Sequence, residues 1–336
     1  SDPRLPDTDP ALRYSVPAWL ADELTQAWGE DRTLQILQAF QESGPLTIRR
    51  NVSRISAGEL EAMLREEGAE AEPAPYAENA YILKHYGRLE QLPSFLKGCF
   101  QVQDVSSMLV CQLAGIRPGD RVLDVCAAPG GKSLHAADLL GGSGLVCACD
   151  LSERKASLIR ENNERCRFAN LNICVQDARA FEPSWQQAFD VVIADLPCSG
   201  LGTLSHKPEI KYRVMPETVR ELAELQRQIL RNAVRYLKPG GTLMYSTCTI
   251  LPEENERQRA WILSELPLRA VPFSDGLPAE LSGGTAEEGY LQLLPGVHRC
   301  DGFFLSRYTT AADGRDSLHR TGFLPENNSG RISDNE

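Results

Sequence analysis

Long apolar runs are missing from this 336-residue sequence. No stretch approaches the roughly 18 apolar residues that cross a bilayer, so we expect no membrane partner. The first ten residues, SDPRLPDTDP, are acidic and proline-rich and contain no apolar segment, so they do not resemble a signal peptide. With 42% hydrophobic and 24% charged residues, the composition is that of a globular protein with one large domain or two smaller ones.

Cysteine pairs with CxxC spacing are also missing, although the chain has ten cysteines. Their absence disfavours a zinc site or thioredoxin-like chemistry, and a chain of this length does not need a disulfide framework. Cys147 and Cys149 alternate in an apolar run, so we expect both to pack on one face of a strand as free core residues. These features favour a reducing, cytoplasmic compartment. Four histidines lack metal-ligand spacing and are interpreted as structural, and no metal is expected: His85, His135, His298 and His319.

Positive charge is in deficit, because 35 Lys and Arg face 46 Asp and Glu, giving a net charge of −11. Nucleic-acid-binding proteins are usually basic, so the balance argues mildly against that class. It does not exclude a local basic cleft inside an acidic envelope. Two stretches could form one: SHKPEIKYR at 205–213 and, more weakly, IRRNVSR at 48–54.

The first hundred residues mix helical and strand patterns. Helices are predicted at 17–28, with Pro17 near the start, and at 31–41, capped by Asp31. A third helix is predicted at 56–68, where Ser56 and Glu59 have capping-box spacing. PLTIRRN and NAYILKHY are typical of strands. We therefore predict a small α+β module over residues 12–100.

From Asp120 onward, apolar strand-length runs alternate with helical patterns. Such a pattern predicts a mostly parallel sheet with helices on both faces, a Rossmann-like α/β fold, over residues 101–310. GFFLSRY near the end predicts a last, antiparallel edge strand, and the polar tail 311–336 is expected to be disordered. The predicted strands are RVLDVC, GLVCACD, LNICVQD, FDVVIAD and GTLMYST. The predicted helices are GKSLHAADLLG, SERKASLIRENNERC and PETVRELAELQRQILRNAVRYLK.

Polar residues stand where these strands end, and in such sheets ligands bind beyond the carboxyl ends of the strands. The first strand runs into CAAPGGKS, a small-residue turn that lets the backbone approach a ligand before a helix begins. The spacing is neither GxGxxG nor a P-loop, which disfavours a nucleoside triphosphate. Asp150, Asp177 and Asp195 end the next three strands.

Three acids around one glycine turn disfavour a diphosphate and suit a ligand with a ribose, an adenine and a cationic centre. S-adenosylmethionine has that chemistry. The alternative is that each aspartate caps a following helix or turn. The predicted cofactor-binding residues are Cys126, Ala127, Ala128, Pro129, Gly130, Gly131, Lys132, Asp150, Lys155, Asp177 and Asp195.

Two cysteines, Cys198 in DLPC and Cys248 in STC, follow the fourth and fifth strands and should reach the same rim of the sheet. The motifs DVCAAPGGKS, DLPCSGLGT and YSTCTILPEENE resemble those of RNA cytosine-C5 methyltransferases of the Nol1/Nop2/Sun group. RYSVPAWL and KPEIKY are most similar to the bacterial Sun (RsmB) branch, which methylates small-subunit ribosomal RNA. That branch usually carries an amino-terminal NusB-like RNA-binding domain, which this sequence does not show.

The resemblance implies a class I S-adenosylmethionine methyltransferase fold and a covalent mechanism. Thiolate addition at carbon 6 of cytosine converts carbon 5 into a nucleophile that can take a methyl group. By resemblance, Cys248 is the attacking nucleophile, Cys198 assists release of the product, and Asp195 hydrogen-bonds the base. A free thiol needs a positive or hydrogen-bonding setting to ionise. Lys132 and the bound sulfonium could each supply it; alternatively, Lys132 is a solvated residue at a helix start.

The target base has to leave its stack to reach such a pocket. The segment 205–213 supplies cations with an aromatic residue between them, a composition suited to phosphate contact and base stacking; a solvated surface loop is the alternative. The predicted RNA-binding residues are His206, Lys207, Lys211, Tyr212 and Arg213. The expected partner is RNA, and we expect a monomer.

Two other functions remain open from the sequence. The first is a methyltransferase acting on DNA, protein or a small molecule; in DNA cytosine-C5 enzymes Cys198 alone would be the nucleophile. The second is a non-catalytic RNA-binding assembly factor with the same fold, which the intact acids, glycine turn and both cysteines disfavour. Transfer RNA or another RNA is an alternative substrate to ribosomal RNA.

Overall fold

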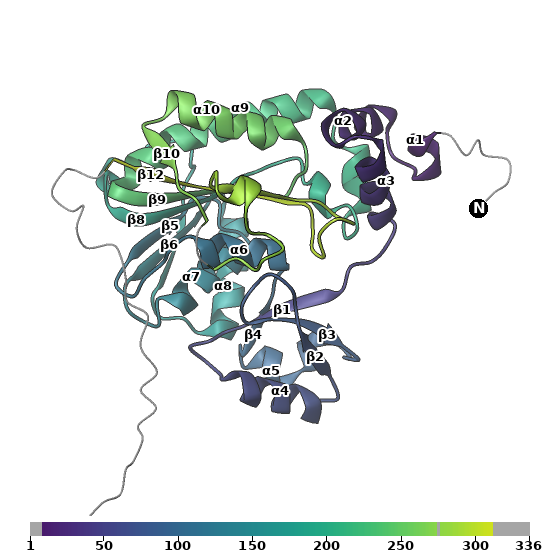
Figure 1. Cartoon of the computed structure of the whole chain (residues 1–336). Helices are drawn as coiled ribbons and strands as arrows, with labels where there is room; N and C mark the ends of the chain where they lie inside the picture. Colours follow the sequence, from purple (N-terminus) through teal and green to yellow (C-terminus); the bar gives the residue numbers. More distant parts are fainter. Residues whose placement is uncertain (1–8, 274–275, 312–336) are drawn as a thin grey trace, which may run out of the picture.

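The structure is a computed structural model that describes residues 9–273 and 276–311 (Figure 1). The tail expected to be disordered lies outside these residues from position 312 onward, as does His319. None of the helices in the described part is long and apolar enough to cross a membrane.

The elements follow one another along the chain as a small mixed region and then a regular alternation. The helices are α1 (Pro10–Arg13), α2 (Ala18–Trp28), α3 (Glu30–Ala39), α4 (Ala57–Glu66), α5 (Pro93–Leu96), α6 (Val105–Leu113), α7 (Gly131–Leu139), α8 (Glu153–Cys166), α9 (Pro216–Ala233) and α10 (Glu256–Glu265). The strands are β1 (Leu46–Arg50), β2 (Glu70–Pro73), β3 (Ala80–Lys84), β4 (Phe100–Val102), β5 (Arg121–Asp124), β6 (Leu145–Asp150), β7 (Leu171–Val175), β8 (Phe189–Asp195), β9 (Leu237–Thr247), β10 (Leu268–Ala270), β11 (Tyr290–Leu293) and β12 (Phe303–Thr310).

The larger sheet has the order β10-β12-β9-β8-β5-β6-β7, and β11 pairs with β12. The neighbouring strands β7, β6, β5, β8 and β9 all run parallel. This confirms the predicted parallel sheet. GFFLSRY forms β12, which is antiparallel as predicted. The prediction that it is the edge strand is wrong, because β10 pairs with its other side. β12 is too buried to lie uncovered at an edge, whereas β10 is a three-residue strand with no apolar pattern that could have predicted it.

Helices cover both faces of this sheet (Figure 1). Residues of α6 and α7 form one apolar core with Val122, Val191 and Ile193, while α9 and α10 form another with Val192 and Ala194. Successive residues of β8 therefore belong to opposite cores, as expected for a strand buried on both faces. The result is the predicted Rossmann-like α/β fold.

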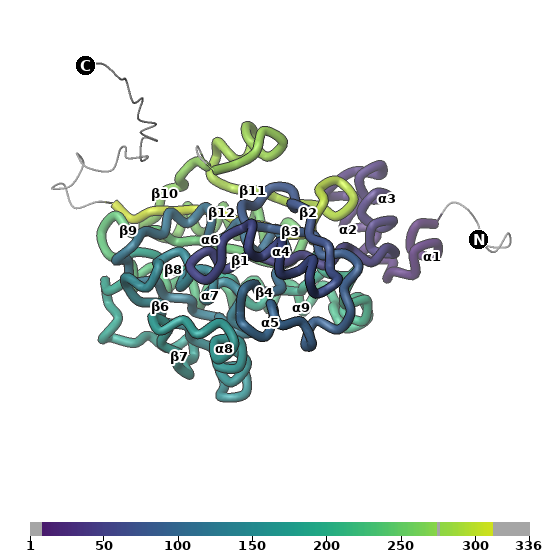
Figure 2. The backbone as a smooth tube through the Cα atoms, turned by 90° about the horizontal axis from the view of Figure 1, so that it is seen from below, coloured from purple at the N-terminus to yellow at the C-terminus, as the bar shows by residue number. Residues whose placement is uncertain are grey.

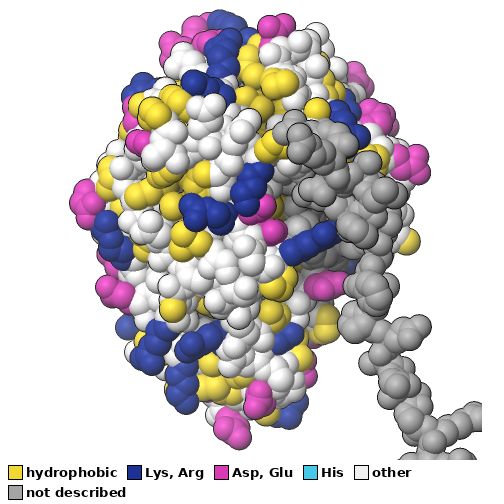
Figure 3. All heavy atoms as spheres, turned by 90° about the vertical axis from the view of Figure 1, so that its left-hand side faces the viewer, with side chains coloured by type: hydrophobic (Ala, Val, Ile, Leu, Met, Phe, Trp, Pro, Cys, Tyr) yellow, Lys and Arg dark blue, Asp and Glu magenta, His cyan; other side chains and the backbone are white. Residues whose placement is uncertain are grey.

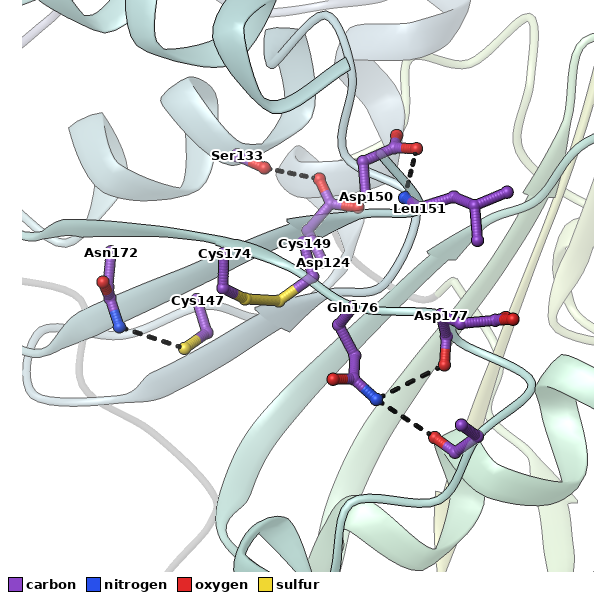
Figure 4. Close-up of a disulfide and its surroundings, with 11 residues drawn as sticks. Asp124, Ser133, Cys147, Cys149, Asp150, Leu151, Asn172, Cys174, Gln176 and Asp177 are labelled. Atoms are coloured by element: carbon purple, nitrogen blue, oxygen red, sulfur yellow. Dashed lines mark hydrogen bonds between the residues drawn. A yellow bond between two sulfur atoms is a disulfide. The ribbon is translucent and has the colours of Figure 1, made fainter. Parts of the chain in front are cut away.

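A disulfide between neighbouring strands corrects one prediction about the cysteines. Cys147 and Cys149 share one apolar cluster, as expected for residues on one face of a strand. Cys147 is free, but Cys149 is bonded to Cys174 (Figure 4). The parallel register of β6 and β7 places these two residues opposite each other, with Cα atoms 4.9 Å apart. The apolar pattern of LNICVQD predicts a strand but not which strand lies beside it. The sequence therefore did not indicate the disulfide with GLVCACD.

The smaller sheet is antiparallel, in the order β2-β3-β1-β4. β1 and β3 are the strands predicted from PLTIRRN and NAYILKHY, whereas β2 and β4 have four and three residues and were not predicted. Ser56 is the N-cap of helix α4 and forms the predicted capping box with Glu59. The Ser56 side chain accepts from the Glu59 N–H, and the Glu59 side chain accepts from the Ser56 N–H. Its Leu60 and Leu64 are buried in the core of this sheet.

Helix α3 starts one residue earlier than predicted and has a different cap. Pro17 precedes α2 as predicted. Helix α3 begins at Glu30, so Asp31 lies in its first turn and is not the cap. Gly29, with φ of 77°, ends α2 and caps α3. A residue without Cβ adopts this left-handed conformation at little cost, so the two helices need no further linker.

Helices α1 to α3 lie beside the larger sheet rather than on the small sheet (Figures 1 and 2). Leu20, Leu24 and Ile36 form one apolar cluster with Leu201 and Ile250, which follow β8 and β9. The amino-terminal residues thus contribute to two separate cores. The predicted domain boundary near residue 100 stays a prediction.

The two sheets meet through a buried charge pair. Arg49 of β1 contacts Asp138 of α7 at 3.2 Å, and each side chain is only 1% exposed. The weaker basic patch predicted at 48–54 is therefore wrong for Arg49, which cannot reach RNA. The alternation of β1 turns this arginine toward the neighbouring helix α7, a partner that a local basic pattern cannot show.

Burial of α2 predicts its contribution to stability. Leu24→Ala should lower the free energy of unfolding by about 2–5 kcal/mol, because the side chain is fully buried and its removal leaves a cavity. Leu12→Ala is the control, since Leu12 is 54% exposed and surface changes usually cost less than about 0.5 kcal/mol. Urea titration followed by circular dichroism measures both. Equal, small losses would contradict the packing of α2 on this core.

Candidate active site

The candidate site lies where the carboxyl ends of β5, β6, β8 and β9 meet. Chain order reverses between β5 and β8, and open α/β sheets bind ligands at such a switch point. At the end of β5, Gly130 has φ of 109° and caps α7. A Cβ at this position would lie 3.2 Å from Ile159, so the turn requires glycine for conformation and for space.

Asp150 lies directly against this turn. Its carboxylate accepts hydrogen bonds from the Ala128 and Leu151 backbone N–H groups, at 2.9 and 2.7 Å, and forms an ion pair with Lys155 Nζ at 3.0 Å. Figure 4 shows Asp150 at the end of its strand, with Asp177 at the end of the next. The structure therefore brings Asp150, Lys155 and the predicted glycine turn together.

Asp177 has a different setting. Arg179 donates to both of its carboxylate oxygens, at 2.7–3.1 Å, and these hydrogen bonds lower the pKa of Asp177. It thus forms a local pair within its own loop, and none of its hydrogen bonds in the described structure reaches the glycine turn.

Lys132 and Asp195 form the charged centre of the site. Lys132 Nζ donates to Asp195 Oδ2 at 2.6 Å and to Ser107 Oγ at 2.8 Å, while Ser246 Oγ donates to Asp195 Oδ1 at 2.8 Å. The Lys132 side chain is only 11% exposed, so the alternative of a solvated lysine is wrong. Burial opposes its charge, but the Asp195 carboxylate raises the pKa of Lys132 above its usual value.

Cys198 and Cys248 lie at the same rim, with their sulfur atoms 3.4 Å apart. The parallel register of β8 and β9 pairs Asp195 with Ser246, so the loops after both strands begin side by side. Either sulfur could be the donor in this contact. The hydrogen bond with Cys198 lowers the pKa of Cys248 against the effect of burial and of Asp195, and Lys132 and Lys207 help to lower it. The same hydrogen bond and burial raise the pKa of Cys198. Cys248 is therefore the thiol that ionises first.

Glu254 connects the two cysteine loops, and the sequence did not identify it. It is fully buried and accepts from the Ser199 N–H at 3.0 Å, from Ser199 Oγ at 2.5 Å and from Gln226 Nε2 at 3.1 Å. Ser199 also bonds Thr249, which follows Cys248. Burial raises the pKa of Glu254. The quoted motif YSTCTILPEENE contains this residue, but its acids look like ordinary surface residues until their burial is known.

The segment predicted to contact RNA forms a short 3-10 helix, η4 (Pro208–Tyr212), after the Cys198 loop. Tyr212 is 67% exposed, and Lys211 Nζ lies 5.1 Å from its ring centre. His206 Nε2 lies 3.3 Å from Asp301. Lys207 is close enough to Cys248 to lower the pKa of its thiol. An exposed aromatic and its cations thus lie on one side of the candidate site.

The face at the starts of the parallel strands has a different character (Figure 3). Where grey atoms do not cover it, Lys and Arg side chains alternate with Asp, Glu and hydrophobic residues. Among the described residues no group of three His, Cys, Asp or Glu side chains could hold a metal ion.

Comparison with known proteins extends these observations. A family model described as 16S rRNA methyltransferase RsmB/F matches residues 111–309, and one for the ferredoxin-like domain of RsmF/B-like methyltransferases matches residues 16–90. Ribosomal RNA small subunit methyltransferase B of Vibrio cholerae is 35% identical over 295 residues, covering 88% of this chain and 65% of that protein. The probable ribosomal RNA small subunit methyltransferase B of Bacillus subtilis is 36% identical over 298 residues, covering 88% and 66%.

The fold is also found among solved structures. A methyltransferase homolog protein from Pyrococcus horikoshii superposes with a TM-score of 0.77 at 29% identity, covering 91% of this chain and all of that one. This chain spans about two thirds of the length of the two curated relatives. The family match extends over more than half of the chain and includes the glycine turn, both cysteines and Glu254. The chain belongs to the RsmB/F family of 16S rRNA methyltransferases.

Proposed function

We propose that this protein transfers a methyl group from S-adenosylmethionine to carbon 5 of a cytosine in RNA, with small-subunit ribosomal RNA as the substrate. The observation that carries the proposal is the juxtaposition of the Cys198–Cys248 pair with the Lys132–Asp195 pair at one rim of the sheet. The curated relatives are named as small-subunit ribosomal RNA methyltransferases. Methylation of a transfer RNA is an outcome that mapping the modified base would reveal.

The glycine turn and Asp150 fit S-adenosylmethionine. The turn around Gly130 consists of small residues, and the first N–H groups of α7 follow it. Asp150 ends the strand next to the turn, where an acid can accept from ribose hydroxyls. When bound, S-adenosylmethionine supplies a methyl group on a sulfonium centre. Lys155, which contacts Asp150 at 3.0 Å, would help to orient that carboxylate.

The two thiols divide the remaining chemistry. The Cys248 thiolate adds to carbon 6 of cytosine, forming a carbon–sulfur bond and moving electron density to carbon 5. Asp195, held by Lys132 and Ser246, faces the base edge and stabilises protonation of its ring nitrogen. After carbon 5 is methylated, a base takes its proton, the freed electron pair restores the carbon 5–carbon 6 double bond, and the carbon–sulfur bond breaks, which releases Cys248 as a thiolate. Cys198, 3.4 Å away, assists this second half.

The order of the thiol pKa values supports this division. The hydrogen bond between the two sulfurs lowers the pKa of Cys248 and raises the pKa of Cys198, so the negative charge is favoured on Cys248. A nucleophile in the PC motif, as in DNA cytosine-C5 enzymes, would require the opposite order. The expectations of a monomer and of a cytoplasmic location stay predictions.

Alanine variants of the two cysteines should differ in whether a covalent protein–RNA adduct accumulates. Cys248→Ala should abolish methylation without forming an adduct, because no thiol adds to carbon 6. Cys198→Ala should still attack but release slowly, so that a protein–RNA species resisting denaturation accumulates. Denaturing gels with target RNA and methyl donor measure both. An adduct with Cys248→Ala and none with Cys198→Ala would reverse the assignment, and retained turnover in both variants would leave the thiols a structural role only.

Calorimetry tests the cofactor site. The protein should bind S-adenosylmethionine and not NAD, and Asp150→Ala should weaken that binding by about tenfold or more, as expected for loss of a hydrogen bond to a charged group. Asp177→Ala tests the third predicted acid, and we expect a smaller loss because its carboxylate is engaged by Arg179. Unchanged affinity in Asp150→Ala would exclude the ribose contact.

Salt dependence tests the RNA surface. Replacing Lys207, Lys211 and Arg213 with Ala should weaken RNA binding and lower the slope of log affinity against log salt by about 2, because each phosphate contact releases a counterion. Affinity for S-adenosylmethionine should not change. Lys238→Ala, at the other end of β9, is the matched control for lost charge. If the triple variant and the control gave the same slope as the unmodified protein, the RNA would lie elsewhere.

A further inference from the structure

The buried carboxylate of Asp138, which pairs with Arg49, has further hydrogen-bond partners. It accepts from the Val52 N–H at 2.7 Å and from the Ser53 N–H at 2.9 Å. Such hydrogen bonds offset part of the cost of burying an ion pair, although Arg49 Nη2 is buried without a partner in the described structure. The pair joins β1 of the small sheet to α7, the helix that begins at the glycine turn and carries Lys132 (Figure 1).

A second hydrogen bond of Arg49 points toward the candidate site. Arg49 Nε donates to Gln103 Oε1 at 3.0 Å, which fixes the direction of the Gln103 amide. Its other end, Nε2, donates to Ser107 Oγ at 3.3 Å. Ser107 Oγ also accepts from Lys132 Nζ at 2.8 Å. Four side chains therefore form one continuous series from the small sheet to the ammonium of Lys132.

Lys132 is the last side chain of this series, and its ammonium group has little room to move. Its ammonium donates to Ser107 on one side and to Asp195 on the other. With 11% of the side chain exposed, water can replace either partner only in part. Loss of the Ser107 oxygen would leave the ammonium with Asp195 as its one hydrogen-bond acceptor and the Phe303 ring at 5.3 Å, so Lys132 would be held less firmly.

We infer that Ser107 and Gln103 are positioning residues that hold Lys132 against Asp195, and that Arg49 of the small sheet fixes them in place. The small sheet then has a role in the chemistry of the site in addition to any contact with RNA. The consequence for turnover rests on the proposed methyl transfer; the consequence for Lys132 itself does not.

Ser107→Ala tests the inference, with Ser106→Ala as the matched control. Both serines lie in α6 at neighbouring positions, but the Ser106 hydroxyl donates to Asp104 and not to the series. The readout is acylation of Lys132 by an amine-reactive reagent at fixed pH, mapped by mass spectrometry without RNA. Removing an acceptor from the ammonium destabilises its charged form, so acylation should rise about tenfold in Ser107→Ala, equivalent to about one unit of pKa. Ser107→Thr, which keeps the hydroxyl, should restore slow acylation.

The Lys132 readout separates positioning from general loosening. Unchanged acylation in Ser107→Ala, or an equal rise in Ser106→Ala, would overturn the inference. Methyl transfer by the same variants is measured in parallel. Ser107→Ala should lower kcat about tenfold with KM for RNA unchanged, whereas Ser106→Ala should leave kcat within about twofold. If the unmodified protein methylated no RNA, the proposed function would fail while the acylation result still decided the role of Ser107.

Arg49→Lys tests the contribution of the small sheet. Lysine keeps the charge opposite Asp138 but loses the planar group whose Nε donates to Gln103. Acylation of Lys132 should again rise, by less than in Ser107→Ala. Gln103→Met carries the same test if circular dichroism shows that Arg49→Lys does not fold. If a folded Arg49→Lys or Gln103→Met variant were acylated at Lys132 at the wild-type rate, the small sheet would have no effect on Lys132.

Discussion

The parallel pairing of β8 with β9 is the constraint on which the site depends. It places Asp195 opposite Ser246, so both the acid and the two cysteine loops leave the sheet at the same level. The loops themselves are irregular, and strand pairing alone would not keep Cys198 within 3.4 Å of Cys248. Glu254 supplies the missing restraint, because it bonds Ser199 in one loop and lies nine residues after Tyr245, whose hydroxyl donates to its carbonyl. A buried acid is tolerated here because each carboxylate oxygen has a partner.

Electrostatics then distinguishes two chemically identical thiols. The carboxylate of Asp195 raises the pKa of both thiols, whereas the hydrogen bond between the sulfurs lowers the pKa of Cys248 and raises that of Cys198, and Lys132 helps to lower the pKa of Cys248. Cys248 therefore ionises first and is the better nucleophile, while Cys198 stays protonated during the attack. Lys132 takes part in this balance and is itself held from the other side by Ser107. The geometry of the site thus depends on contacts from both sheets.

Much of this organisation could be predicted from the sequence, for identifiable reasons. The parallel strands and their helices have long, regular apolar patterns, and the acids at strand ends follow from the sheet topology. Cys198 and Cys248 were recognised through their motifs. Short strands such as β10 carry too few residues for a pattern, so β12 was assigned to the edge. Arg49 looked like part of a basic patch, because a charged residue in sequence does not show that its partner lies 89 positions away at Asp138. Glu254 and Ser107 were missed for the same reason: their roles come from burial and from long-range partners.

Cys248 is the activated thiol, and Cys198 activates it through the hydrogen bond that lowers the pKa of Cys248. The most direct measurement is the rate of alkylation of each cysteine by iodoacetamide as a function of pH, under reducing conditions, with the modified residues identified by mass spectrometry. We expect Cys248 to be alkylated with a midpoint at lower pH than Cys198, since a thiolate reacts and a thiol does not. We also expect Cys198→Ala to move the Cys248 midpoint to higher pH. A lower midpoint for Cys198, or a Cys248 midpoint that does not move, would contradict these roles of the two thiols.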